Sequence, residues 1–333
     1  MKPDFSLEPF RPSRVWLDPH AQTMVANTVR PSRGVLFHRL RLDTPDGDFL
    51  DLDFAAVPEV ELAAEAPLVL LLHGLEGSAR RGYACEMYRQ LARRGVRSVG
   101  LNFRSCSGEM NRTARLYHAG VSDDVAFVVD WLEERLPQVA KGAVGFSLGA
   151  NTLLKYLGEQ GERTPIRTAA VVSPPFDLAR VARIFANGSG RLYAPRFLKD
   201  LRQKALEHIR LNGSDVDSKR IAEIKTVRDF DDAFTAPVHG FLNADDYYEK
   251  SSCAQFLPDI KVPTLIIRAF DDPFFANDVP HAALAENDHL FPALVPHGGH
   301  VAFAEGLWPD RFSYWAERQA ARFLTQYLSD QAR

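Results

Sequence analysis

Residues 142–152 read Gly-Ala-Val-Gly-Phe-Ser-Leu-Gly-Ala-Asn-Thr, and this stretch decides the fold. A short apolar run leads into Gly145-Phe-Ser-Leu-Gly149, and a run suited to a helix follows it. A strand, a sharp turn and a helix in this order are typical of a nucleophile elbow, in which the turn exposes the Oγ of Ser147. We expect both flanking glycines to be required, because a Cβ at either position would collide with the neighbouring strand or helix.

The parts that such a serine needs occur elsewhere in the chain. Residues 67–72 (Pro-Leu-Val-Leu-Leu-Leu) have the pattern of a buried strand, and His73-Gly-Leu-Glu-Gly-Ser78 follows them directly. In enzymes built on this elbow, the loop after that strand supplies one oxyanion-hole N–H, and the residue after the nucleophile supplies the other. We therefore predict an oxyanion hole formed by the backbone amides of Leu75 and Leu148.

An acid and a histidine follow the serine in the order Ser, acid, His. The buried-strand pattern 262–267 runs into Arg-Ala-Phe-Asp-Asp-Pro at 268–273, and the apolar run 290–295 leads to His297-Gly-Gly-His300. This chain order is that of the α/β-hydrolase fold, and it differs from the orders of chymotrypsin and subtilisin. The four signals together predict this fold and a serine-based acyl transfer.

Each member of the predicted triad has a role. Ser147 is the nucleophile, and it needs a base because a serine hydroxyl is weakly nucleophilic at neutral pH. His300 would take the proton of Ser147 and later donate it to the leaving alkoxide. Asp272, which directly precedes Pro273, would hold the His300 tautomer and stabilise the imidazolium.

Neighbouring residues are alternatives for two of these roles. Asp271 precedes Asp272, and its other role would be to accept hydrogen bonds from loop amides. Asp177 stands after an earlier strand pattern, where some hydrolases place the acid. His297 competes with His300, but it lies nearer the strand end, where a structural hydrogen bond is the expected role.

The sequence predicts no metal and no cofactor. Cys85, Cys106 and Cys253 lie far apart without a C-x-x-C pattern, which disfavours a disulfide framework and a zinc site. We find no Gly-rich phosphate loop, HExxH motif or pair of catalytic carboxylates. We expect His73 to brace the oxyanion loop and Cys106 to be a small buried apolar residue.

Several blocks carry a resemblance to a known family: Trp16-Leu-Asp-Pro-His-Ala-Gln-Thr23, His73–Ser78, Asn102-Phe-Arg-Ser-Cys-Ser-Gly108, Gly145–Gly149 with Leu154-Lys-Tyr-Leu-Gly-Glu159, Ser173-Pro-Pro-Phe-Asp177, Asp271-Asp-Pro-Phe274 and His297-Gly-Gly-His-Val301. On these blocks the chain resembles the YheT-like esterase family of the α/β-hydrolase superfamily, almost end to end. The resemblance implies a serine hydrolase of carboxylic esters, with medium-chain acyl esters and acylglycerol-like lipids as substrates. Ser105 and Ala150 depart from it, since members often carry glycine there.

Strand and helix patterns alternate along the chain. Predicted strands are 35–42 and 49–54, which form an antiparallel hairpin at the sheet edge, then 67–72, 96–101, 142–146, 168–172, 264–269 and 290–295. Predicted helices are 79–94, 122–136 and 148–159, with an amphipathic stretch at 195–211. Such alternation indicates an α/β fold with a mostly parallel, doubly wound sheet.

The predicted organisation is a single α/β-hydrolase domain over residues 1–333. Residues 1–34 are expected to form an irregular N-terminal arm. An inserted helical cap is expected at about 178–255, between the strand patterns at 168–172 and 264–269. Its phenylalanines and tyrosines could line an acyl channel or form the core of the cap itself.

Composition excludes some classes of partner. The chain has 333 residues, with 40 basic and 43 acidic residues and a net charge of −3, so nothing favours nucleic acid as a partner. The N-terminus does not resemble a signal peptide, and no apolar run approaches the ~20 residues of a transmembrane helix. We expect a cytoplasmic protein, and the sequence does not predict its oligomeric state.

The predicted function is that of a serine carboxylesterase, a carboxylic ester hydrolase that acts on a small-molecule ester of short or medium acyl chain through an acyl-serine intermediate. A thioesterase or an alcohol acyltransferase could use the same triad. A binding protein without catalysis on a hydrolase scaffold is the alternative from another class, and a broken triad would be its signature.

Overall fold

The computed structural model describes residues 5–12, 17–213, 216–275, 278–306 and 312–329. Eight of its strands form one sheet: β1 (Leu36–Asp43), β2 (Phe49–Ala56), β3 (Leu68–Leu72), β4 (Arg97–Asn102), β5 (Lys141–Phe146), β6 (Ile166–Val172), β7 (Thr264–Ala269) and β8 (Leu290–Val295). Their order in the sheet is β1-β2-β4-β3-β5-β6-β7-β8. A two-stranded sheet pairs β9 (Ala304–Glu305) with β10 (Ser313–Tyr314).

Strands β4, β3, β5, β6, β7 and β8 are parallel, while β1 and β2 form the antiparallel edge. Strands β3, β5 and β7 are buried along their whole length, as apolar runs in the centre of a parallel sheet must be. The predicted mostly parallel sheet and its edge hairpin are confirmed.

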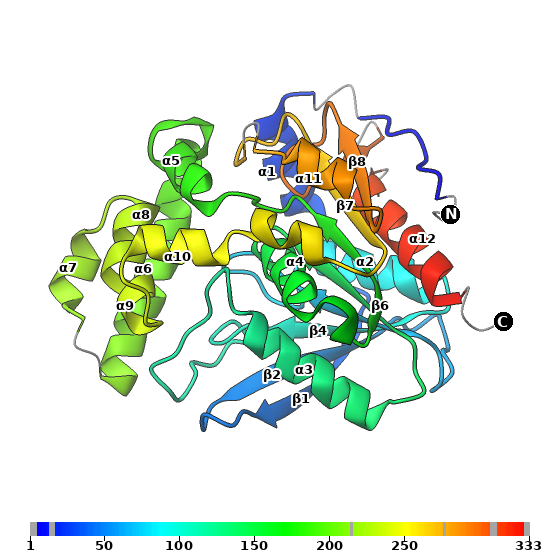
Figure 1. The fold of residues 1–333 in the computed structure, drawn as a ribbon, viewed down its shortest axis with the longest axis horizontal. Helices are drawn as coiled ribbons and strands as arrows, with labels where there is room; N and C mark the ends of the chain where they lie inside the picture. The colour runs from blue at the N-terminus through cyan, green and yellow to red at the C-terminus, as the bar shows by residue number, and fades with distance from the viewer. Residues whose placement is uncertain (1–4, 13–16, 214–215, 276–277, 307–311, 330–333) are drawn as a thin grey trace.

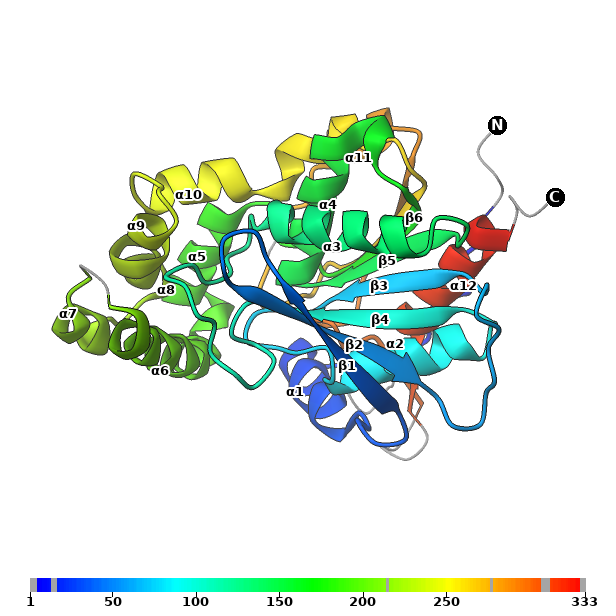
Figure 2. The ribbon, with the colours of Figure 1, turned by 90° about the horizontal axis from the view of Figure 1, so that it is seen from below.

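The helices are α1 (Pro19–Val29), α2 (Gly82–Ala92), α3 (Ser122–Arg135), α4 (Leu148–Gln160), α5 (Leu178–Asn187), α6 (Ala194–Asn212), α7 (Ser218–Glu223), α8 (Val227–Phe230), α9 (Ala236–Val238), α10 (Ala244–Ser251), α11 (His281–Glu286) and α12 (Trp315–Ser329). Helices α3 and α4 bury their apolar sides against one face of the sheet, and α2 and α12 cover the other face. Figure 2 shows α3 above the strands and α2 below them. This is the doubly wound arrangement that the sequence predicted.

The segment 178–255, which we call the cap, connects β6 to β7 and contains α5 to α10. Figure 1 shows α6 to α9 as a group at one end of the molecule, joined to the rest through α5 and α10. Helix α6 extends one residue beyond each end of the amphipathic stretch predicted at 195–211. The cap has an apolar cluster of its own, to which Leu198, Phe230 and Phe234 contribute.

The expectation of an irregular arm is wrong for residues 19–29, which form α1. Asp18 caps this helix by accepting a hydrogen bond from the Ala21 N–H at 2.7 Å, and Pro19 occupies the first helical position. Both residues favour helix initiation, and they outweigh the polar character of the surrounding segment. Figure 2 shows α1 beside α2, below the sheet.

Among the described residues, none of the helices is long and apolar enough to cross a membrane.

Candidate active site

Ser147 lies at the tight turn between β5 and α4, with φ +53° and ψ −118°. Positive φ is uncommon outside glycine, and such strain persists only where the surrounding structure enforces it. The Ser147 N–H donates to the carbonyl of Val172, the last residue of β6, at 2.9 Å. The backbone here has the strained turn that is expected of a nucleophile elbow.

Gly145 and Gly149 flank the serine where the chain packs most tightly. A Cβ on Gly145 would lie 2.5 Å from the carbonyl oxygen of Gly149 in α4. A Cβ on Gly149 would lie 2.4 Å from the carbonyl oxygen of Leu72, at the end of β3. Both approaches are impossible for a real side chain, so the prediction that helix and strand require these glycines is confirmed.

Loops at the carboxyl ends of β5, β7 and β8 bring Ser147, Asp272 and His300 together. The Oγ of Ser147 lies 3.0 Å from His300 Nε2, and His300 Nδ1 lies 2.9 Å from Asp272 Oδ2. Asp272 and His300 are 3% and 6% exposed, whereas Ser147 is half-buried. This arrangement can pass a proton from the serine to the imidazole while a buried carboxylate fixes the other ring nitrogen.

Asp272 is held by groups on both of its oxygens. Its Oδ1 accepts a hydrogen bond from the Phe274 N–H at 2.9 Å. Its Oδ2, the oxygen that faces His300, also accepts from the Arg268 guanidinium at 3.1 Å. Arg268 is 1% exposed and reaches Asp278 at 2.7 Å as well, so one buried cation is shared by two carboxylates.

The residues considered as alternatives for the acid and the base make other contacts, away from the hydrogen bond between Ser147 and His300. Asp271 accepts hydrogen bonds from the Gly299 N–H at 2.9 Å and from His297 Nδ1 at 3.2 Å. The side chain of His297 is 51% exposed. Asp177 caps α5 by accepting from the Arg180 N–H. Asp271 therefore orders the loop that carries the histidine, as its alternative role would require.

The loop after β3 lies directly beside the serine. A Cβ on Gly74 would lie 3.2 Å from Ser147 Cβ, so the loop packs against the nucleophile at the residue that precedes Leu75. Leu148 is the first residue of α4, and the first amides of a helix have no acceptor within it. The two amides predicted for the oxyanion hole thus lie on the two segments that enclose Ser147.

His73 braces this loop from beneath. Its Nε2 accepts from the Phe103 N–H at 3.1 Å, so the proton is on Nδ1, which donates to the Gly74 carbonyl at 2.7 Å. Burial lowers the pKa of His73 to about 3, and the ring therefore stays neutral. Both nitrogens are occupied, which agrees with a bracing role and not with that of a base.

Glu76 links the loop after β3 to the cap. Its backbone has a φ of +51°, and its N–H donates to the Tyr117 hydroxyl at 2.8 Å. Its carboxylate accepts from Tyr117 at 2.7 Å and from Lys204 of α6 at 2.9 Å. Lys204 also lies 3.2 Å from the sulfur of Cys106, whose pKa burial raises to about 11, so this thiol stays protonated.

An aromatic stack joins the cap to the predicted base. The Phe274 ring lies 4.2 Å from the His300 ring at an interplanar angle of 27°. On the side of the cap, Tyr193 and Phe185 lie 4.6 and 5.3 Å from Phe274. Phe230 and Phe234 belong to a separate apolar cluster within the cap, while Phe185 packs with Phe274 and Phe275 in a buried cluster next to His300.

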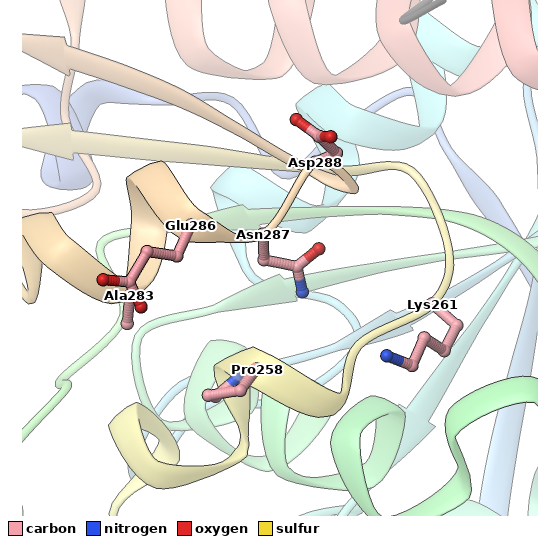
Figure 3. Close-up of a pocket in the computed structure, with 6 residues that line it drawn as sticks. All are labelled: Pro258, Lys261, Ala283, Glu286, Asn287 and Asp288. Atoms are coloured by element: carbon pink, nitrogen blue, oxygen red, sulfur yellow. The ribbon is translucent and has the colours of Figure 1, made fainter.

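Two surface hollows are lined by residues other than the predicted triad. The first, of about 180 Å³ and shown in Figure 3, is lined by Pro258, Lys261, Ala283, Glu286, Asn287 and Asp288. Lys261 precedes β7 and Asp288 precedes β8, so this hollow is at the amino ends of strands whose carboxyl ends carry the triad. The second lies around the start of β4.

In the part of the chain that the structure describes, no three His, Cys, Asp or Glu side chains gather in a way that could hold a metal ion.

Sequence reasoning missed three contacts of the site: Arg268 on Asp272, Phe274 on His300 and Lys204 on Glu76. One signal was available for Arg268, because a charged residue inside an otherwise apolar strand must be paired once it is buried. The other two contacts join segments far apart in the chain, and no local pattern identifies such partners.

Comparison with known proteins places the chain among hydrolases. A family described as "alpha/beta hydrolase fold" matches residues 67–307. "Putative esterase YheT" of Escherichia coli (strain K12) is 35% identical over 327 residues, which cover 96% of this chain and 94% of YheT. "Monoacylglycerol lipase" of Saccharomyces cerevisiae is 31% identical over 80% of this chain and 61% of the lipase.

Among solved structures, the Pyrococcus furiosus esterase Pf2001 is similar with a TM-score of 0.58 at 16% identity, over 88% of this chain and 91% of the esterase. At this identity the likeness shows the fold alone. The chain therefore belongs to the alpha/beta hydrolase fold family and is a relative of YheT.

Proposed function

We propose that this protein is a serine carboxylesterase that hydrolyses short- to medium-chain acyl esters, including acylglycerol-like lipids, through an acyl-serine intermediate. The hydrogen-bonded series Ser147–His300–Asp272 carries the proposal. The family and the esterase and lipase names of its relatives support a hydrolase of esters.

In the proposed mechanism, Ser147 Oγ attacks the ester carbonyl carbon while its proton moves to His300 Nε2. Asp272 accepts the Nδ1–H of the imidazole and stabilises the cation that forms, without taking the proton itself. The negative oxygen of the tetrahedral intermediate accepts hydrogen bonds from the amides of Leu75 and Leu148.

The intermediate collapses when the bond to the alcohol breaks and His300 donates its proton to the leaving alkoxide. Water then attacks the acyl-serine, with His300 as base, and releases the carboxylic acid and Ser147. We place the acyl chain on the side of the triad that faces the cap, because the apolar ring of Phe274 stacks on His300 there.

A fluorophosphonate probe tests the nucleophile, because it phosphonylates an activated serine without needing a matched substrate. We expect one equivalent of label on Ser147, hydrolysis of p-nitrophenyl butyrate, and loss of both in Ser147→Ala. Ser329→Ala is the matched control, since Ser329 is exposed at the end of α12 and its hydroxyl donates to the Thr325 carbonyl of the same helix. An unlabelled wild-type protein, or full labelling of Ser147→Ala, would refute the proposal. Exclusive turnover of thioesters, or acyl transfer to an added alcohol without hydrolysis, would redirect it to those activities.

A further inference from the structure

Helix α1 forms hydrogen bonds directly with the backbone of His300. The His300 N–H donates to Thr23 Oγ1 at 2.9 Å, and its carbonyl accepts from Asn27 Nδ2 at 3.1 Å. Arg30, which caps the end of α1, donates to the carbonyls of Val301 and Ala302 at 3.1 and 2.7 Å. Thr23, Asn27 and Arg30 follow at i, i+4 and i+7, so a single side of α1 makes all four contacts.

The directions of these bonds are fixed by the partners of each side chain. Thr23 gives its hydroxyl proton to the Pro19 carbonyl at 2.6 Å, which leaves an oxygen lone pair for the His300 N–H. Asn27 donates to the Thr23 carbonyl at 2.9 Å in addition to His300. Arg30 is 4% exposed and is paired with the buried Glu317. None of these groups can rotate freely.

The loop that α1 contacts is strained. Gly298, Gly299, Val301 and Phe303 all have positive φ, and Val301 is β-branched, which makes its φ of +56° a marked outlier. A backbone of this kind persists only where surrounding contacts over-determine it. A Cβ on Gly299 would lie 2.7 Å from Thr23 Oγ1, so the helix also packs tightly against the loop.

We propose that Thr23, Asn27 and Arg30 are positioning residues that hold the strained 298–303 loop so that His300 Nε2 reaches Ser147. The proposal rests on the proposed function, because it assigns these residues to the same triad. His300 has its imidazole fixed by Asp272 and its backbone fixed by α1. The backbone bonds set how far the ring extends toward the serine.

Thr23→Val tests this most directly, because it keeps the shape of the side chain and removes the oxygen that accepts from His300. A misplacement of about 1 Å at a reacting group can cost roughly 10²-fold in rate. We expect kcat for p-nitrophenyl butyrate and the maximal rate of fluorophosphonate labelling to fall about 10- to 100-fold, with KM changed less than about twofold. Thr23→Ser retains the oxygen and should recover most of the rate.

Thr28→Val is the matched control on the same helix. Thr28 is exposed and its hydroxyl donates to the Met24 carbonyl, away from the loop, so wild-type rates are expected. Equal rates in Thr23→Val and wild type, or equal losses in Thr23→Ser and Thr23→Val, would overturn the proposal. If Thr23→Val does not fold, Asn27→Leu removes the donor to the His300 carbonyl and should give the same pattern.

A crystal structure of Thr23→Val separates this proposal from the proposed function. We expect the distance from His300 Nε2 to Ser147 Oγ to exceed hydrogen-bond reach, whatever the protein hydrolyses. An unchanged distance would overturn the positioning role even if the enzyme is an esterase. Absence of labelling in wild type together with the expected displacement would instead refute the esterase and leave the positioning role in place.

Discussion

The guanidinium of Arg268 and the imidazole of His300 both contact the same carboxylate oxygen, Oδ2 of Asp272, at 3.1 and 2.9 Å. Arg268 also pairs with Asp278, so its removal would leave two buried carboxylates close together without a cation. Breaking a buried ion pair by deleting one partner typically costs about 3–5 kcal/mol.

Arg268→Met should therefore lower the free energy of unfolding by about 3–5 kcal/mol, measured by urea denaturation. Arg167→Met, at an exposed position of β6, is the control and should stay within about 0.5 kcal/mol of wild type. If both variants unfold at the same urea concentration as wild type, Arg268 does not stabilise the acid loop.

Asp272 and Asp271 make different contacts, and their amide variants should differ accordingly. Asp272→Asn should reduce kcat about 10⁴-fold, the loss that a serine triad suffers when its acid becomes an amide and the histidine takes the wrong tautomer. Asp271→Asn removes only a loop contact to Gly299 and His297 and should cost much less. Steady-state kinetics with p-nitrophenyl butyrate distinguish the two, and a larger loss in Asp271→Asn would transfer the role of the acid to that residue.

Asp231 in the cap gives stability a defined pH dependence. Burial raises its pKa from 3.8 to about 6, even though the hydroxyl groups of Tyr248 and Thr235 donate hydrogen bonds to its carboxylate. A raised folded pKa means that the folded protein binds this proton more tightly than the unfolded chain does. The stability that it contributes is present below about pH 4 and is lost as the pH rises through about 6.

Asp231→Asn should therefore gain stability relative to wild type between pH 4 and pH 7.5, by up to roughly 3 kcal/mol. Urea denaturation at a series of pH values measures the difference. Asp229→Asn, at an exposed position of α8, is the control for an Asp-to-Asn change in the same part of the cap and should stay within about 0.5 kcal/mol of wild type. If the difference in the free energy of unfolding between Asp231→Asn and wild type does not change with pH, burial does not raise the pKa of Asp231.

Lys204 donates a hydrogen bond to the carboxylate of Glu76, whose backbone has a positive φ. Glu76 directly follows Leu75, which carries one of the two predicted oxyanion amides. Lys204→Met removes this link between α6 and the loop while keeping the length of the side chain. We expect kcat to fall at least about tenfold, with the 10²–10³-fold loss of an oxyanion donor as the upper limit. Lys199→Met, exposed on the same helix, should behave as wild type. A drop in both variants would point to a general effect of charge on the cap.

Much of the fold could be predicted because its signals are local. The strands at 264–269 and 290–295 match the structure to the residue, since both are apolar runs flanked by turn residues. Helix α1 shows the limit of such reasoning. Asp18 and Pro19, which start this helix, are local signals that the sequence contains. The contact of the helix with His300, however, joins residues more than 270 positions apart, and no local pattern predicts it.

The site was predictable where a role demands a residue type at a fixed position. Each of the three predicted triad residues, Ser147, Asp272 and His300, lies in a loop that follows a strand. Parallel strands bring such loops to one edge of the sheet. The groups that orient them follow no such rule. Ser105 illustrates this: it adopts a φ of +61°, and its hydroxyl accepts a hydrogen bond from the Asn111 N–H at 3.0 Å, a contact that no local motif predicts.

The cap should set the acyl chain length that the enzyme prefers. Each buried methylene contributes about 0.8 kcal/mol, or roughly a fourfold gain in kcat/KM, until the apolar space is filled. For p-nitrophenyl esters from two to sixteen carbons, we expect a rise, a maximum at short to medium chains and a fall thereafter. Phe197 of α6 packs at 5.9 Å from Phe274, the ring that covers His300. Phe197→Ala should therefore move the maximum to longer chains, while Leu211→Ala, at an exposed position on α6, should leave it in place. A profile that is flat from acetate to palmitate, or one that Phe197→Ala does not shift, would mean that this part of the cap does not contact the acyl chain.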